Sequence, residues 1–285
     1  MARESESKLN RLQHLLPERL LVTASWLEAR GYSSQLRSQY VAAAWLEQPV
    51  RGVYRRPGLQ LNWDDVVASL QGLLGVPAFV GGRSALEVEG YAHYISPDGL
   101  REVHLYTREQ LPGWLFKLGL GVRFVGHNAD RLFPELPVPT PRQLDFINTA
   151  SVPDDAETDM LQASGLQELT LDSDAWPVWG STPERAVLEL LDGVPHRETF
   201  EQADKFMEAL HTLRPTLVQH LLEECRSIKV KRVFLWLAER HDFAWLGKLD
   251  LERVDLGSGK RVLVKGGRLD PKYQITVPAE LAGVE

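Results

Sequence analysis

The sequence predicts an α+β protein, in which a small helical N-terminal unit precedes a larger mixed α/β region with a helical section. Three observations predict this class. Short helical segments with cap residues fill residues 8–46. Alternating, strand-like segments recur between residues 77 and 128. Amphipathic helical segments dominate residues 181–240. We assign residues 1–60 to the first domain and 61–285 to the second, with a candidate sub-boundary near 151–180.

The N-terminal unit contains three helical segments. The first, residues 8–16, places its leucines on one face and ends before Pro17. Thr23 or Ser25 can cap the second, because a side-chain oxygen there accepts a hydrogen bond from an orphan amide. Gly31 follows, where a helix end favours a residue free to adopt positive φ. Ser33 can cap the third segment, which we expect to run to about Leu46.

The third segment has two different faces. Its apolar residues recur at helical spacing and are expected to pack inward: Leu36, Tyr40, Ala43 and Ala44. Another face carries Gln35, Ser38, Gln39 and Ala42, without an acidic residue. Glutamine can form two hydrogen bonds with adenine, and short polar side chains allow close approach to base edges. Arg37 flanks this face and could reach a phosphate.

After Pro49, the stretch VRGVYRR alternates and carries Arg51, Arg55 and Arg56. A helix-turn-helix followed by a basic wing is the simplest interpretation. The alternative is an ordinary pair of helices around a glycine turn. Charge favours the first: residues 1–60 hold nine Lys+Arg against five Asp+Glu, net +4, whereas the remainder holds 23 against 34, net −11. A basic segment on an acidic body is typical of a nucleic-acid-binding module.

The second domain begins with a helix, residues 64–75, capped by Asn62 or Asp64. Gly81 and Gly82 precede a helical turn at 84–90. Two glycines before a helix can hold an anion, but this stretch lacks the lysine and spacing of a P-loop, so we expect a close-packed strand-to-helix turn. The alternating residues 102–107 predict a strand, and 121–128 is strand-like. Prolines within 134–141 predict an irregular connection.

Residues 151–160 are acidic and polar, and we expect an exposed loop there. One strand should follow within 166–175. Ser181 or Thr182, Pro183, Glu184 and Gly193 mark the ends of a strong helix. Further helices are expected at 199–213, 215–225 and 230–240. The C-terminal 251–278 predicts short strands around glycine turns, with GSGK as a hairpin turn.

We expect no enzyme, because no recognisable arrangement of nucleophile, base and orienting group occurs. His93 and His104 could meet with Glu87 or Glu89 at a metal, but ordinary polar histidines are favoured. We expect neither cofactor nor metal. The single cysteine, Cys225, excludes an intramolecular disulfide and is expected to be buried. No membrane span or signal peptide is evident, which favours a cytoplasmic location.

Several stretches, in order, resemble the AbiEi antitoxins of type IV toxin–antitoxin systems. They are TASWLEARGYSSQLRSQYVAAAWLEQPVRGVYRRPG, FVGGRSALEVEGYAHY, STPERAVLELLDG, IKVKRVFLWLAE and DLGSGKRVLVKGGRLDPKYQITVP. The resemblance implies a winged helix-turn-helix that binds double-stranded DNA at inverted repeats upstream of its own operon and represses it. It also implies a C-terminal part that counteracts a nucleotidyltransferase-like toxin without a stable complex, and self-association on the operator is an expectation.

Carried onto this sequence, base reading falls to Gln35, Ser38 and Gln39, flanked by Ser34 and Arg37. The wing contacts fall to Arg51, Tyr54, Arg55 and Arg56. Two alternatives stay open. One is a stand-alone winged-helix regulator or protein-interaction module without a toxin partner. The other is an enzyme that uses the histidines near residues 81–104.

Overall fold

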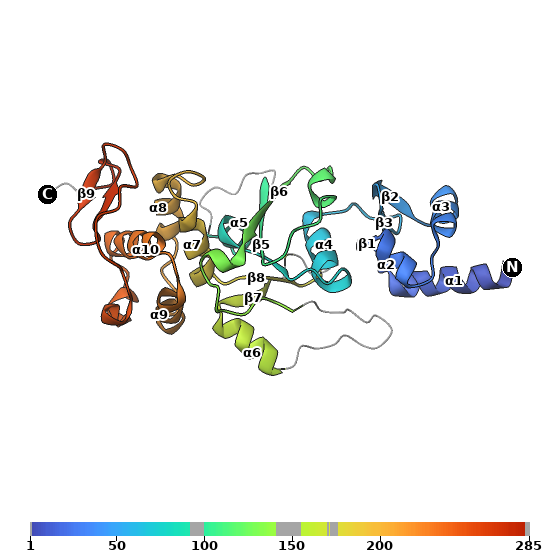
Figure 1. The fold of residues 1–285 in the computed structure, drawn as a ribbon, viewed down its shortest axis with the longest axis horizontal. Coiled ribbons are helices and arrows are strands. Elements are labelled where there is room, and N and C mark those ends of the chain that lie inside the picture. Colours follow the sequence, from blue (N-terminus) through green and yellow to red (C-terminus); the bar gives the residue numbers. More distant parts are fainter. Residues whose placement is uncertain (1, 92–99, 141–154, 170, 172–175, 283–285) are drawn as a thin grey trace.

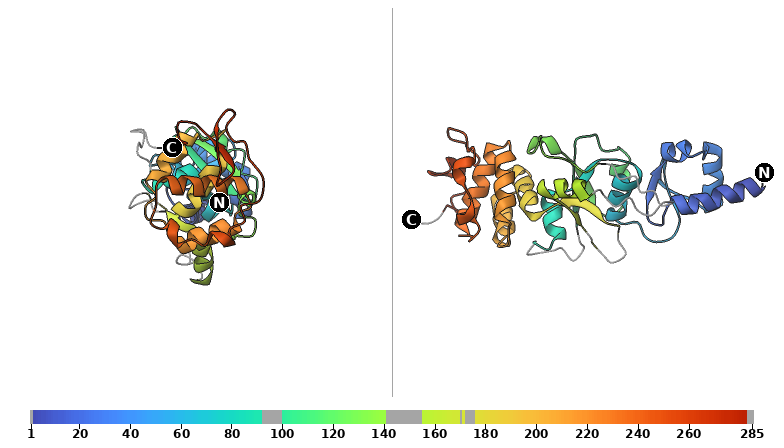
Figure 2. Two further views of the ribbon diagram at one scale, coloured as in Figure 1. Left: turned by 90° about the vertical axis from the view of Figure 1, so that its left-hand side faces the viewer. Right: turned by 90° about the horizontal axis from the view of Figure 1, so that it is seen from below.

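The computed structural model describes residues 2–91, 100–140, 155–169, 171 and 176–282. The molecule is long in one direction and narrow end-on (Figure 2). The N-terminal unit forms one end, a mixed sheet lies in the middle, and a helical section with the C-terminal strands forms the other end (Figure 1). The fold is α+β, as the sequence predicts.

The N-terminal unit is a winged helix-turn-helix. Its elements are α1 (Ala2–Leu15), β1 (Leu21–Thr23), α2 (Ala24–Ala29), α3 (Ser34–Ala42), β2 (Glu47–Val50) and β3 (Val53–Arg55). The Thr23 hydroxyl accepts a hydrogen bond from the Trp26 amide, and the Ser33 hydroxyl accepts one from Leu36. Gly31 has a φ of 86°, so the turn between the helices uses the conformation that glycine allows.

Two local predictions for this unit were wrong. The sequence did not predict β1, which pairs with β3 and completes the three-stranded sheet β1-β3-β2. The third helix ends at Ala42 and not at Leu46, because Ala44 adopts a left-handed φ of 56°. Ala43 and Ala44, which we expected inside, are therefore exposed.

The middle of the molecule is a five-stranded mixed sheet in the order β6-β5-β4-β8-β7. Its strands are β4 (Ala78–Val80), β5 (Glu102–Thr107), β6 (Arg123–Asn128), β7 (Leu166–Leu169) and β8 (Val178–Ser181). β5 and β6 were predicted, whereas β8 was not. β7 and β8 complete a sheet that starts at residue 78, so the segment near 151–180 lies within the range of this sheet, and the sub-boundary there stays a prediction.

The two faces of the sheet pack against different parts of the chain. One face joins the winged helix and α4 (Trp63–Ala68), which continues into the π-helical turn η1 (Ser69–Leu73), in one hydrophobic cluster. The Leu21 amide donates to the Ser69 hydroxyl at 2.7 Å, and Arg19 Nε lies 2.9 Å from Asp65 Oδ1. The boundary we placed at residue 60 is thus bridged by apolar and polar contacts.

The other face of the sheet meets three helices and the loops around them. These are α5 (Gly82–Val88), α6 (Asp155–Ala163) and α7 (Pro183–Asp192). Residues 155–163 form α6 and not the loop that we expected, because its Leu161 finds a buried place beside Phe79 and Trp179. The described residues also contain four short 3₁₀ turns. They are η2 (Leu115–Lys117) and η3 (Ala129–Arg131) in this region, and η4 (Leu246–Lys248) and η5 (Leu251–Arg253) near the C-terminus.

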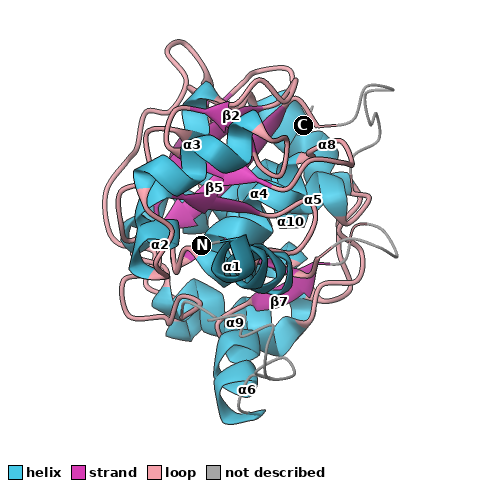
Figure 3. Ribbon diagram, turned by 90° about the vertical axis from the view of Figure 1, so that its right-hand side faces the viewer, coloured by secondary structure: helices cyan, strands magenta, loops and turns pink. Residues whose placement is uncertain are grey.

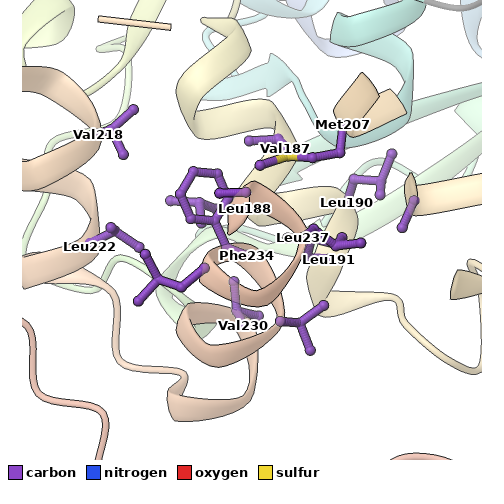
Figure 4. Packing of buried hydrophobic residues seen from close by; sticks show 14 of the residues in the cluster. Val187, Leu188, Leu190, Leu191, Met207, Val218, Leu222, Val230, Phe234 and Leu237 are labelled. Atoms are coloured by element: carbon purple, nitrogen blue, oxygen red, sulfur yellow. The ribbon is translucent and has the colours of Figure 1, made fainter. Parts of the chain in front are cut away.

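The helical section packs around α7 in one apolar core. It contains α8 (Phe200–Glu208), α9 (Pro215–Glu224) and α10 (Ile228–Arg240), all predicted. Val187, Leu191, Met207 and Phe234 meet in its interior (Figure 4). Cys225 is buried there as expected, and burial raises the pKa of its thiol to about 11.

The C-terminal segment ends in the antiparallel pair β9 (Arg268–Asp270) and β10 (Ile275–Val277). The GSGK stretch is a loop with two left-handed glycines, Gly257 and Gly259, and is not a turn between two paired strands. Its backbone is held by Arg232, which donates to the Leu256 and Gly259 carbonyls. Within the described ranges, no helix is both long and apolar enough to cross a membrane.

Candidate nucleic-acid interface

The outer face of α3 is polar and open to solvent. Ser34, Gln35, Ser38, Gln39 and Ala42 are all exposed. In both Figure 1 and Figure 3, α3 lies beside β2 at the end of the molecule that carries the N-terminus. The side chains that we predicted to read bases therefore share one accessible helix face, with no acidic residue in α3 itself.

The orientation of α3 follows from the residues on its inner side. Tyr40 is 5% exposed and belongs to the cluster shared with the sheet, and Leu36 packs against the same cluster. Tyr40 also meets Tyr32, with ring centroids 6.4 Å apart. Burying these apolar side chains turns the glutamine face outward. Ser38 donates its hydroxyl hydrogen to the Ser34 carbonyl, one turn earlier on the same face.

Arg37 does not lie at this surface, which corrects our expectation that it flanks the reading face. The residue is 7% exposed, and its guanidinium donates to the Tyr32 carbonyl at 2.6 Å and to the Ala24 carbonyl at 3.4 Å. It also lies 5.9 Å from the centre of the Tyr54 ring. Because its donors serve the backbone of the helix-turn-helix, Arg37 stabilises the turn and is not available to a phosphate.

The wing offers fewer free charges than its sequence indicates. Arg51 is exposed in the two-residue turn between β2 and β3. Arg55, by contrast, donates to the Glu47 carboxylate at 2.7 Å and to the Leu59 carbonyl at 2.9 Å. Arg56 pairs with Glu18 at 3.1 Å. Arg55 and Arg56 are therefore engaged within the protein, which weakens their expected role as wing contacts, and that role stays a prediction.

Tyr54, the fourth residue that we expected in the wing, is half-buried and packs against the hydrophobic cluster. Its ring lies against Arg37, so one of its faces is turned toward α3. Tyr54 thereby connects the wing to the helix whose orientation the interface requires.

Two further cations and one aromatic side chain escaped the sequence prediction. Lys8 and Arg11 are exposed on α1, and the Lys8 carbonyl accepts a hydrogen bond from the Tyr32 hydroxyl, which places this part of α1 beside the turn before α3. Both lie within one helical turn of the buried Leu12, and their positive charge was their only signal in the sequence. Trp45, 48% exposed, follows α3 directly, but our helix prediction ran through it.

The glycine pair at the start of α5 forms the close-packed turn that we expected and holds an internal anion. The Gly82 amide donates to Glu189 Oε2 at 2.9 Å, and Ser181 donates to the same oxygen at 2.8 Å. A Cβ on Gly81 would lie 2.4 Å from that oxygen, so only glycine fits. The carboxylate already occupies the position that a bound phosphate would need.

The histidine–carboxylate metal site, which we considered and did not favour, finds no support in the described residues. His93 lies outside them, and His104 contacts His127 instead, with Nδ1 and Nε2 2.9 Å apart. No group of three or more potential metal ligands occurs in the part of the chain that the structure covers.

Three helices, of which α3 turns a polar face outward, and a three-stranded sheet define a winged helix-turn-helix protein. Residues 5–97 match the family described as transcriptional regulator, AbiEi antitoxin N-terminal domain, and residues 133–278 match transcriptional regulator, AbiEi antitoxin, type IV TA system. The chain belongs to this AbiEi antitoxin family, a family of transcriptional regulators and antitoxins and not a class of enzymes.

A solved structure has the same overall fold. The crystal structure of the RV2827C protein from Mycobacterium tuberculosis matches with a TM-score of 0.52 and 17% sequence identity, over 95% of this chain and 90% of that chain. At this identity the similarity concerns the fold alone. No curated protein matches the sequence.

Proposed function

We propose that this antitoxin is a sequence-specific DNA-binding autorepressor. α3 enters the major groove, with Gln35, Ser38 and Gln39 at base edges and Ser34 at their margin. Arg51 contacts the phosphate backbone from the wing, and Lys8 and Arg11 do so from α1. The observation that carries the proposal is the exposed, acid-free polar face of α3 beside the wing.

The operator is an inverted repeat upstream of the protein's own operon, occupied by two copies related by two-fold symmetry. A winged helix reads one half-site, so a palindromic operator mirrors a symmetric pair of protomers. The copies meet on the DNA. The C-terminal part counteracts a nucleotidyltransferase-like toxin without forming a stable complex with it. Family membership supports these statements, and we assign no residues of this chain to them.

Gel-shift titration of the full chain against its own upstream region tests DNA binding. We expect retardation at low salt that a scrambled duplex of equal length does not reproduce. The double variant Gln35→Ala/Gln39→Ala should lose about 1–3 kcal/mol of discrimination for each bidentate contact removed, and should retain weak, non-specific binding. A matched control is Gln162→Ala, an exposed glutamine on α6.

Lack of retardation of the cognate duplex at low salt would refute the proposal. Equal losses in the double variant and in Gln162→Ala would place the reading face elsewhere. Indifference to DNA together with capture of a neighbouring gene product would instead favour a protein-interaction role for the winged helix.

A further inference from the structure

A cavity of about 240 Å³ lies on the side of the sheet that faces α5 and α7. Its wall is formed by β5, β6 and η3 on one side and by the end of α7 with residues 193–198 on the other. The winged helix packs on the opposite face of the sheet. The cavity is therefore separate from the proposed DNA interface.

One wall of the cavity is formed by the rings of His104, His127 and Tyr106, which stack in a row that Phe79 continues behind the lining. The ring centroids of Phe79 and Tyr106 are 5.7 Å apart, those of Tyr106 and His127 are 4.6 Å apart, and those of His127 and His104 are 5.0 Å apart. The alternation of β5 places His104 and Tyr106 on this face and Val103 and Leu105 on the other. Tyr106 and His127 each stack between two other rings, which restrains their orientation.

Both histidines in this wall are neutral, and the hydrogen bonds define which ring nitrogen of each one carries the proton. Arg197 can only donate, so its hydrogen bond of 3.1 Å makes Nδ1 of His127 an acceptor. His127 must then carry its proton on Nε2 and donate it to Nδ1 of His104 at 2.9 Å. Nε2 of His104 in turn carries a proton 3.3 Å from the Glu102 carboxylate. Burial is the main cause that lowers the pKa of both histidines.

The carboxylates that line the cavity are all paired. Glu198 binds Arg83, with Arg83 Nε and Glu198 Oε1 2.9 Å apart. Asp192 binds Arg131, and Glu189 binds Arg185 at 2.9 Å.

One cation in the lining remains after this pairing. Arg197 is exposed at the cavity, and the one partner found for its guanidinium among the described residues is the neutral His127. The Lys229 ammonium lies outside the lining, where it donates to the Asp192 and Val194 carbonyls at 2.7 Å each and lies 3.9 Å from Asp192 Oδ1. Arg197 is therefore the lining cation that has no carboxylate partner among the described residues.

We propose that this cavity binds a small oxyanion, a carboxylate or a phosphate ester, with Arg197 as its charge partner. Asn128 adds an amide donor, because its side-chain oxygen accepts from the Asp130 amide and no described residue accepts from its NH₂ group. The volume is below the roughly 300–1,000 Å³ typical of drug-sized ligands, so the cavity favours a small anion.

The test observes His127 directly by NMR titration of the full chain, with inorganic phosphate, acetate or sodium chloride at matched ionic strength. An oxyanion beside Arg197 offsets the positive charges that act on His127, so its pKa should rise by about one unit. His127→Gln identifies the resonance. Arg197→Gln should weaken anion affinity at least about tenfold, whereas Arg253→Gln, an exposed arginine paired with Glu223, should not.

A response to phosphate alone assigns a phosphate ligand, and a response to acetate alone assigns a carboxylate ligand. An equal response to chloride would indicate screening and would overturn the proposal. So would an anion-induced shift that persists in Arg197→Gln, or a lack of response to both oxyanions.

Discussion

Arg37 lies on the inner side of α3 and ties that helix to the segments before it. Its two carbonyl partners belong to the end of the turn and to the start of α2, so one guanidinium spans the helix-turn-helix. Removal of such a residue leaves buried carbonyls without donors, which is more costly than the loss of an exposed charge. Its contribution is to stability and to the orientation of α3.

We therefore expect Arg37→Met to lower the free energy of unfolding by about 1–3 kcal/mol, because the methionine fills the space but donates no hydrogen bonds. Urea denaturation measures this. The salt dependence of DNA binding by the folded variant should stay unchanged, since Arg37 faces no phosphate. A stable variant with a shallower salt dependence would contradict this role.

His127 makes stability depend on pH. Burial, followed by electrostatic interactions with His104, Arg197 and Arg131, lowers the pKa of its ring from 6.5 to about 4. Between these values the unfolded chain binds more protons than the folded chain, so the free energy of unfolding falls as the pH drops from about 6.5 to about 4. Because the ring is partly exposed, we expect a loss of about 1–2 kcal/mol.

Chemical denaturation at a series of pH values tests this expectation. The decline over this window should be smaller in His127→Gln than in the unaltered protein, whereas His220→Gln should retain it. An identical decline in His127→Gln and in the unaltered protein would show that other groups cause it.

At the scale of single elements, the wing shows how ion pairing changes the meaning of a basic sequence. Three arginines occur within six residues, but two of them form ion pairs: Arg55 with Glu47 on the neighbouring strand, and Arg56 with Glu18 before the first strand. Arg51 differs because its place in the turn lifts it away from both strands. Among the described side chains of the winged helix, Lys8, Arg11 and Arg51 are the cations for which no ion pair or hydrogen bond with another described side chain is found.

Arg51→Met should therefore reduce the slope of log affinity against log salt by about 0.9, the value for one phosphate contact. Arg55→Met is the matched comparison, and it should leave the slope nearly unchanged and instead lower stability. Gel shifts across a salt series measure both. A larger change of slope in Arg55→Met than in Arg51→Met would reverse our assignment.

The sequence predicted most elements whose signal is local. Thr23, Ser33 and Gly31 correctly bounded the helices of the winged unit, and the alternation of residues 102–107 predicted β5 with its observed limits. The polar face of α3 was also predictable, because helical spacing separates it from Tyr40.

Elements that depend on distant partners could not be predicted in this way. β1 is three residues long and exists because β3 pairs with it, and β8 exists between β4 and β7. Helix α6 forms on an acidic segment because Leu161 reaches a buried site. The pairing of Arg55 with Glu47, and the cavity between β6 and α7, likewise depend on contacts that no local pattern reveals.

At the scale of the whole molecule, the winged helix is joined to the sheet without an intervening flexible connection. α4 packs against both, and one hydrophobic cluster includes residues from β1, α4 and β5. Asp65 is fully buried and binds Arg19 from the winged helix as well as the amide of Asn62 at 2.9 Å. Both parts are therefore expected to unfold in one transition.

A double-mutant cycle with Arg19→Met and Asp65→Asn should give a coupling energy of about 1–3 kcal/mol, because one partner is removed from water and the contact joins the two parts. The more exposed pair Arg56 and Glu18 is the comparison, and it should give about 0–1 kcal/mol. Denaturant titration supplies all values. Two separate unfolding transitions in the unaltered protein would refute the expectation that the winged helix and the sheet unfold together.

The small number of unpaired cations among the described residues of the winged helix has a consequence for how the proposed repressor would find its operator. Few positive charges are available to contact phosphates, and the rest of the chain has a net negative charge. The protein would therefore bind non-specific DNA only weakly. Most copies would then stay unbound in solution and reach the operator by three-dimensional diffusion and not by sliding along DNA. Occupancy of the promoter would follow the cellular concentration of the protein more closely than it follows changes in ionic strength.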